Sequence, residues 1–225
     1  MKKNIIILLG FLIPMALFAG GTKEKHEFIK ISTKYGTATV MLYNETPLHR
    51  DNIVKLAKKN FYDSLIFHRV IQDFMIQGGD PTSRGGAEGK VLGAGEIEYT
   101  IPAEINNIRY HKRGVIAAAR NNNPTKASSG CQFYLVQGKR FTYDELDTTK
   151  YSKEKIDTYV TQGGTAYLDG NYTVYGEIVD GIEMVDRIAA LKTAPGDRPL
   201  ENVFMKVEYV NEKEAKKLDK KYGTK

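Results

Sequence analysis

Residues 67–80 read FHRVIQDFMIQGGD, and this stretch decides the fold. Its first half has the β-branched and aromatic content of a strand. Because side chains alternate along a strand, we expect Phe67, Arg69 and Ile71 to share one face. A turn at Gln72-Asp73 should follow, and a second short strand after it.

The second strand brings a polar side chain next to the arginine of the first. Pairing of the two strands would place Gln77 beside Arg69, with Phe74 and Met75 adjacent to both. The stretch therefore predicts an apolar pocket with one fixed guanidinium, that of Arg69. We expect Gln77 to hold this guanidinium in place.

The same kind of strand pattern recurs along the chain. Eight runs have strand length: residues 28–33, 37–43, 65–71, 74–77, 114–119, 132–136, 173–179 and 203–210. Apolar residues at helical spacing predict helices over residues 47–60 and 182–191. Many short strands with few helices indicate a mainly β chain that forms a closed barrel or a sandwich.

Two segments lie outside this pattern. Residues 139–166 are charged and poor in strand signals. Thr142 with Glu145 predicts a capping box there, and residues 152–162 predict a helix that ends at a Gly-Gly pair. We expect residues 139–166 to be a partly helical surface insertion. Residues 211–225 form a Lys-rich tail, which is typical of a solvated helix face.

The chain begins with the layout of a secretory signal peptide. Lys2 and Lys3 precede an apolar run at residues 5–13, and small residues follow. We predict cleavage after Ala19, with Gly21 as the alternative site. The run is shorter than the ~20 residues of a comfortable membrane span, so an uncleaved anchor is the weaker interpretation. Residues 20–27 would be a linker, and the protein would be exported, to the periplasm or the medium.

Composition narrows the function classes. The net charge is +6, or 6 − 2 = +4 without Lys2 and Lys3, so a nucleic-acid partner has little support beyond the tail. Cys131 is the one cysteine, which leaves no internal disulfide. The four histidines are scattered, and the glycines of residues 85–95 fit neither phosphate-loop nor dinucleotide spacing. We therefore expect no metal and no cofactor. A Ser/His/Asp triad is not excluded by composition, although no Gly-x-Ser-x-Gly elbow occurs.

The quoted stretch resembles the cyclophilin family of peptidyl-prolyl isomerases. Three further blocks match in family order: GVIAAA at residues 114–119, SGCQFYL at 129–135 and LDGNYTVYG at 168–176. The resemblance covers residues 28–210, apart from the insertion. It implies a closed eight-stranded antiparallel barrel capped by two α-helices, and a groove that binds proline-containing polypeptides.

The resemblance also implies roles for individual residues. Arg69 and Gln77 would be catalytic, with the guanidinium directed at the amide nitrogen of an X–Pro bond. The expected substrate-binding residues are Phe74, Met75, Ala119, Gln132, Tyr134, Tyr167, Leu168 and Tyr172. The protein would be a monomeric isomerase that assists the folding of exported proteins. The alternative is a non-catalytic module or chaperone that only binds proline segments.

Five positions depart from the family pattern. Tyr134 stands where Phe is common, and Tyr172 where His is common. Tyr167 replaces the Trp that the family associates with tight cyclosporin binding, so we expect weak cyclosporin inhibition. Arg120 and Asn121 replace Asn-Ala. The second cation, Arg120, would favour acidic substrates.

Overall fold

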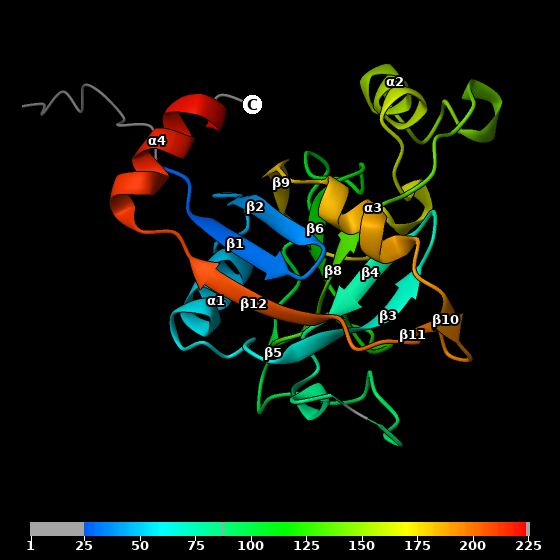
Figure 1. Ribbon diagram of the computed structural model, residues 1–225. Coiled ribbons are helices and arrows are strands. Elements are labelled where there is room, and N and C mark those ends of the chain that lie inside the picture. Colours follow the sequence, from blue (N-terminus) through cyan, green and yellow to red (C-terminus); the bar gives the residue numbers. More distant parts are fainter. Residues whose placement is uncertain (1–24, 87, 224–225) are drawn as a thin grey trace, which may run out of the picture.

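The structure is a computed structural model that describes residues 25–86 and 88–223. Eight antiparallel strands close a barrel in the order β1-β12-β3-β4-β8-β6-β9-β2 (Figure 1). The barrel strands are β1 (Phe28–Thr33), β2 (Gly36–Leu42), β3 (Leu65–Ile71), β4 (Met75–Gly78), β6 (Val115–Ala118), β8 (Phe133–Val136), β9 (Val174–Asp180) and β12 (Phe204–Tyr209). The predicted eight-stranded barrel is confirmed.

Alternating side chains fill the barrel interior. Ile29 and Ile31 of β1 face Ala38 and Val40 of β2 in one buried cluster, and all four are 0% exposed. Fully burying one such aliphatic side chain contributes about 1.5–3 kcal/mol. The other face of the wall also carries apolar residues, among them Met75 and Tyr134, which form a second cluster outside the interior.

Two helices pack against the interior cluster as expected. Helix α1 (Pro47–Lys58) starts with a proline at its first turn, where the missing N–H costs nothing. Its predicted inner residues Ile53, Leu56 and Ala57 are buried. Helix α3 (Glu183–Ala189) buries Val185, Ile188 and Ala189, whereas Ile182 is only partly buried.

The segment 139–166 stands on the surface, where Figure 1 shows α2 above the barrel. It contains a 3₁₀ turn η2 (Tyr143–Glu145), α2 (Lys153–Thr161) and the start of η3 (Ala166–Leu168). The capping box of Thr142 and Glu145 is present. Leu146, Ile156, Tyr159 and Ala166 form a small core of its own, so the insertion is ordered rather than a loose loop.

The tail forms helix α4 (Glu212–Tyr222) and packs against the barrel. Its lysines face solvent, but Ala215 and Tyr222 are buried in the cluster that contains Phe28. Lys30 Nζ donates to Glu214 Oε1 at 2.6 Å. Helix α4 therefore covers part of the outer wall instead of extending freely.

Four short strands were not anticipated. The ladders are β5 (Thr100–Ile101) with β7 (Ser128–Ser129), and β10 (Thr193–Ala194) with β11 (Arg198–Pro199). Within residues 25–86 and 88–223, no helix is long and apolar enough to cross a membrane. The predicted signal peptide, residues 1–19, lies outside the described residues.

Candidate active site

A pocket of about 140 Å³ opens on the outer face of the barrel wall. Its lining residues are Arg69, Phe74, Met75, Gln77, Ala119, Arg120, Tyr134, Leu168 and Tyr172. Eight of the ten residues that the sequence nominated thus meet in one place. Of the other two, Gln132 is buried behind the pocket, and Tyr167 lies at its rim.

Strand register builds the pocket. Arg69 pairs with Gln77 across β3 and β4, and Gln77 pairs with Tyr134 across β4 and β8. The three residues therefore form one row across the wall. Asp73, at a φ of 60°, makes the tight turn between β3 and β4. Asp is one of the few non-glycine types that adopt this conformation readily.

A β-bulge turns Arg69 toward the pocket. The register shifts between Phe67 and Arg69, so His68 is an extra residue in β3. Phe67 belongs to the interior cluster, whereas Arg69 lines the outer pocket. The prediction that Phe67 and Arg69 share a face is therefore wrong, because the extra residue reverses the alternation. Without the bulge, β3 would direct this side chain into the barrel.

The floor of the pocket is apolar and fixed. Met75 is 1% exposed and Tyr134 is 5% exposed. The Tyr172 ring packs edge-on against Tyr134, with 6.0 Å between the centroids. At the rim, Tyr167 is 58% exposed and its ring centroid lies 5.8 Å from that of Phe74.

Asp197, and not Gln77, holds the guanidinium. Arg69 Nε donates to Asp197 Oδ2 at 3.2 Å. Gln77 Nε2 instead donates to Gln132 Oε1 at 3.1 Å, so the expected hydrogen bond between Gln77 and Arg69 is wrong. The pairing is open to solvent, with the two side chains 41% and 44% exposed. The hydrogen bond uses Nε, so the outer edge of the Arg69 guanidinium stays available to a ligand.

Gln132 has a structural position rather than a groove position. It is 3% exposed, and its Nε2 donates to Gly93 O at 3.1 Å and Gly95 O at 2.7 Å. Both amide hydrogens are thereby used, which leaves Oε1 to accept from Gln77. The expected contact of Gln132 with a substrate backbone has no support in this arrangement.

Both charged residues that line the pocket are cations. Arg120 Nε donates to Asn171 O at 3.0 Å, and its guanidinium lies 4.7 Å from the centre of the Tyr172 ring. These contacts fix Arg120 at the wall of the pocket, and none of the lining residues is a carboxylate. Within the described residues, no group of three or more acidic, His or Cys side chains is arranged to hold a metal ion.

A hydrogen-bonded chain behind the floor was missed from the sequence. His111 Nε2 lies 2.9 Å from Tyr134 Oη, and His111 Nδ1 lies 2.9 Å from Asp169 Oδ1. Tyr159 of α2 donates to Asp169 Oδ2 at 2.7 Å. Burial raises the pKa of Tyr134 and of Tyr159, which keeps both phenols protonated as donors. The tyrosine at 134 was the available signal, because a buried hydroxyl needs a partner.

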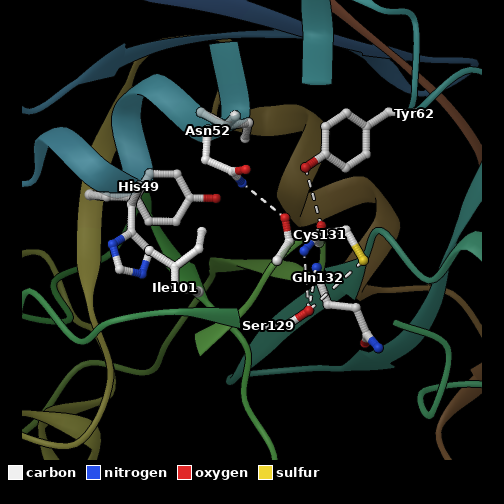
Figure 2. Close-up of a pocket in the computed structure, with 11 residues that line it drawn as sticks. His49, Asn52, Tyr62, Ile101, Ser129, Cys131 and Gln132 are labelled. Atoms are coloured by element: carbon white, nitrogen blue, oxygen red, sulfur yellow. Dashed lines mark hydrogen bonds between the residues drawn. The ribbon is translucent and has the colours of Figure 1, made fainter. Parts of the chain in front are cut away.

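A second, much smaller cavity of about 10 Å³ lies beneath residues 129–132 (Figure 2). Asn52 Nδ2 donates to Gly130 O at 2.8 Å, and Tyr62 Oη donates to Cys131 O at 3.1 Å. Figure 2 shows both bonds converging on this segment, which they hold in place just before β8. Burial raises the pKa of the Cys131 thiol to about 11, so it is not a nucleophile.

Three polar residues beside this cavity align as in a hydrolase triad. His49 Nε2 lies 2.9 Å from Ser128 Oγ, and His49 Nδ1 lies 2.6 Å from Glu104 Oε2. However, Ser128 is 1% exposed and the cavity has room for about one water molecule. No substrate can reach the hydroxyl. The group is structural: Glu104 also accepts the free N–H groups of Leu48 and His49 at the start of α1.

Comparisons with known proteins agree with this geometry. A family model described as cyclophilin type peptidyl-prolyl cis-trans isomerase matches residues 28–211. A Staphylococcus aureus (strain COL) protein named for the same activity is 37% identical over 182 residues, which span 79% of this chain and 88% of that protein. A Streptococcus pyogenes serotype M6 protein, named as a bifunctional phosphatase and isomerase, is 34% identical over 79% of this chain and 37% of its own length.

Solved structures show the same fold. The crystal structure of a Cryptosporidium parvum cyclophilin type isomerase superposes with a TM-score of 0.62 at 22% identity, covering 83% of this chain and 98% of that one. A second structure, obtained in the presence of the dipeptide Ala-Pro, gives a TM-score of 0.60 over 82% and 99% of the two chains.

Proposed function

We propose that this chain, which belongs to the cyclophilin-type peptidyl-prolyl cis-trans isomerase family, assists the folding of exported proteins by turning their X–Pro bonds at the pocket of Arg69. Peptidyl-prolyl isomerase activity follows from membership of the family. The export role rests on the predicted signal peptide, and the residue roles rest on the geometry of the pocket.

The reaction breaks no covalent bond. An X–Pro amide resists rotation by about 18–20 kcal/mol, because its C–N bond has partial double-bond character. In the twisted state that resonance is lost, and the nitrogen gains a lone pair that can accept a hydrogen bond. A donor placed there stabilises the twisted state more than either planar state, and this difference is what accelerates rotation.

Arg69 meets the requirements for that donor. Its guanidinium lies at the wall of a pocket with an apolar floor, and its planar fork presents several N–H donors. Met75 and Tyr134 would take the proline ring, and the cation would then face the amide nitrogen. Each 1.36 kcal/mol of preferential stabilisation gives about a tenfold faster rotation.

The juxtaposition of one guanidinium with this apolar floor is the observation that carries the proposal. The test compares wild type with Arg69→Ala and Arg69→Lys in a proline-isomerisation assay. We expect Arg69→Ala to lower kcat/KM by about a hundredfold, the loss typical of removing a transition-state donor. The kcat/KM of Arg69→Lys should lie between those of wild type and Arg69→Ala, because lysine keeps the charge but lacks the planar fork.

Arg140→Ala is the matched control, since Arg140 is an exposed arginine that does not line the pocket. Equal activity of Arg69→Ala and wild type would contradict the catalytic assignment and favour a proline-binding module. The export role has a separate test: fractionation of the producing cells and N-terminal sequencing, with Gly20 expected as the first residue of the mature chain. An uncut chain confined to the cytoplasm would contradict it.

A further inference from the structure

We infer that Asp197 is a positioning residue for the isomerase reaction: it holds Arg69 by Nε and leaves both Nη groups for the substrate. The inference rests on the catalytic role proposed for Arg69. Asp197 lies between β10 and β11, 128 residues further along the chain, and does not itself line the pocket.

Two adjacent hydrogen bonds attach this turn to β3. Arg69 Nε donates to the side chain of Asp197, and Val70 N donates to the main-chain oxygen of the same residue at 2.8 Å. The main-chain bond sets the separation between the turn and the strand. The backbone of the turn therefore places the Asp197 carboxylate beside Arg69.

The turn itself is built to present an aspartate. β10 and β11 pair Ala194 with Arg198, so three residues make the connection. Gly196 has a φ of 83° and Asp197 a φ of 60°, both in the left-handed region. Among residues with a side chain, Asp and Asn accept that region most readily. A carboxylate can therefore stand at this point with little strain.

The choice of nitrogen matters for catalysis. In the described residues, no hydrogen bond uses Nη1 or Nη2 of Arg69, and the side chain contributes to the pocket wall. A carboxylate that gripped the fork through both Nη groups would compete with the substrate. Contact through Nε instead restricts the rotation of the guanidinium and keeps its outer edge open. Preorganised donors of this kind stabilise a transition state without reorganisation during the reaction.

The test uses variants that preserve the turn. Asp197→Gly removes the carboxylate and tolerates the left-handed backbone, and Asp197→Asn keeps the shape but loses the charge. We expect Asp197→Gly to lower kcat about tenfold, equivalent to 1.36 kcal/mol, with KM within about twofold of wild type. The kcat of Asp197→Asn should lie between those of wild type and Asp197→Gly. Asp73→Asn is the matched control, because Asp73 is an exposed aspartate with the same φ of 60° in the turn before Phe74.

A double-mutant cycle separates positioning from a general structural effect. If Asp197 acts through Arg69, Asp197→Gly should change the residual activity of Arg69→Ala by less than about twofold. Unchanged or raised kcat in Asp197→Gly would overturn the inference, as would an equal loss in both backgrounds. An Arg69→Ala variant as active as wild type would instead overturn the proposed function, so the two failures are distinguishable.

Discussion

The hydroxyl of Tyr134 lies 2.9 Å from Nε2 of His111, and the two rings stack with an angle of 9° between their planes. Tyr134 forms the pocket floor, while His111 is 1% exposed behind it. From His111 the chain of hydrogen bonds continues through Asp169 to Tyr159 in the insertion. The insertion is therefore tied to the back of the pocket, and Asp169 directly follows Leu168 of its wall.

Replacing Tyr134 by the phenylalanine common in the family should destabilise this protein. Tyr134→Phe keeps the ring but leaves a buried imidazole nitrogen without a partner, at a cost of about 1–3 kcal/mol. Urea unfolding at neutral pH measures the loss. Isomerase activity should remain within about threefold of wild type, because the apolar floor is retained.

Tyr143→Phe is the control for Tyr134→Phe. It removes a hydroxyl of an exposed residue, and surface changes of this kind stay within about 0.5 kcal/mol. An equal free energy of unfolding for the two variants would show that the hydrogen bond between Tyr134 and His111 does not stabilise the fold.

The barrel could be predicted because its strands are short apolar runs, rich in β-branched and aromatic residues and separated by turn residues. All eight barrel strands were expected within a residue or two of their observed bounds, as were α1 and α3. The four short strands were missed, since two-residue ladders carry no periodicity. The bulge at His68 was also missed. A single inserted residue leaves no trace in composition, yet it decides which way Arg69 points.

The lining of the pocket could be predicted, but its hydrogen bonds could not. Motif matching placed Gln77 near Arg69 correctly, because strand register follows from the turn. It assigned Gln77 the wrong partner, since the competing acceptor on Gln132 depends on the distant loop that contains Gly93 and Gly95. Asp197 is likewise 128 residues from Arg69, a separation that no local pattern spans.

Arg120 should give the pocket a preference for acidic substrates. Arg69 is paired with Asp197, whereas Arg120 donates to the main-chain oxygens of Asn171 and Asn121. A Glu next to proline would therefore gain an attraction of about 1 kcal/mol from Arg120 at water-like screening. We expect Arg120→Gln to reduce the ratio of kcat/KM for Glu-flanked over Lys-flanked peptides about fivefold.

Arg140→Gln should leave that ratio unchanged, and added salt should weaken the preference of wild type. A peptide panel measured at low and high salt checks both points. A ratio of one in wild type would contradict the preference.

Tyr167→Trp should strengthen the binding of cyclosporin. Tyr167 is 58% exposed at the rim beside Phe74, at a position where the family resemblance associates tryptophan with tight cyclosporin binding. Indole adds apolar area and an N–H donor, which together are worth about 1–2 kcal/mol, or roughly five- to thirtyfold in Kd. Inhibition titrations of both proteins measure the change. Submicromolar inhibition of wild type would contradict the expected weak binding.

His68, the extra residue of the bulge, should make the fold sensitive to acid. Neither ring nitrogen has a hydrogen-bond partner within the described residues, and the side chain is 4% exposed. Burial lowers the pKa of His68 to about 4; the nearby Asp80 opposes the shift, and Arg69 and Arg198 add to it.

The sign of the effect follows from proton uptake by the unfolded chain. An unfolded histidine binds a proton near pH 6.5, whereas the folded one resists until about pH 4. The stabilisation is therefore complete above about pH 6.5 and is lost as the pH falls toward 4. Between about pH 7 and 4.5 this group alone should remove about 2 kcal/mol of stability.

His68→Leu tests this assignment. Leucine has nearly the same volume and no proton to bind, so the variant should match wild type within about 1 kcal/mol near pH 7 and exceed it near pH 4.5. Some pH dependence should remain, because burial also lowers the pKa of His49. Urea unfolding across this pH range gives the comparison, and parallel pH profiles for the two proteins would rule out His68 as the source.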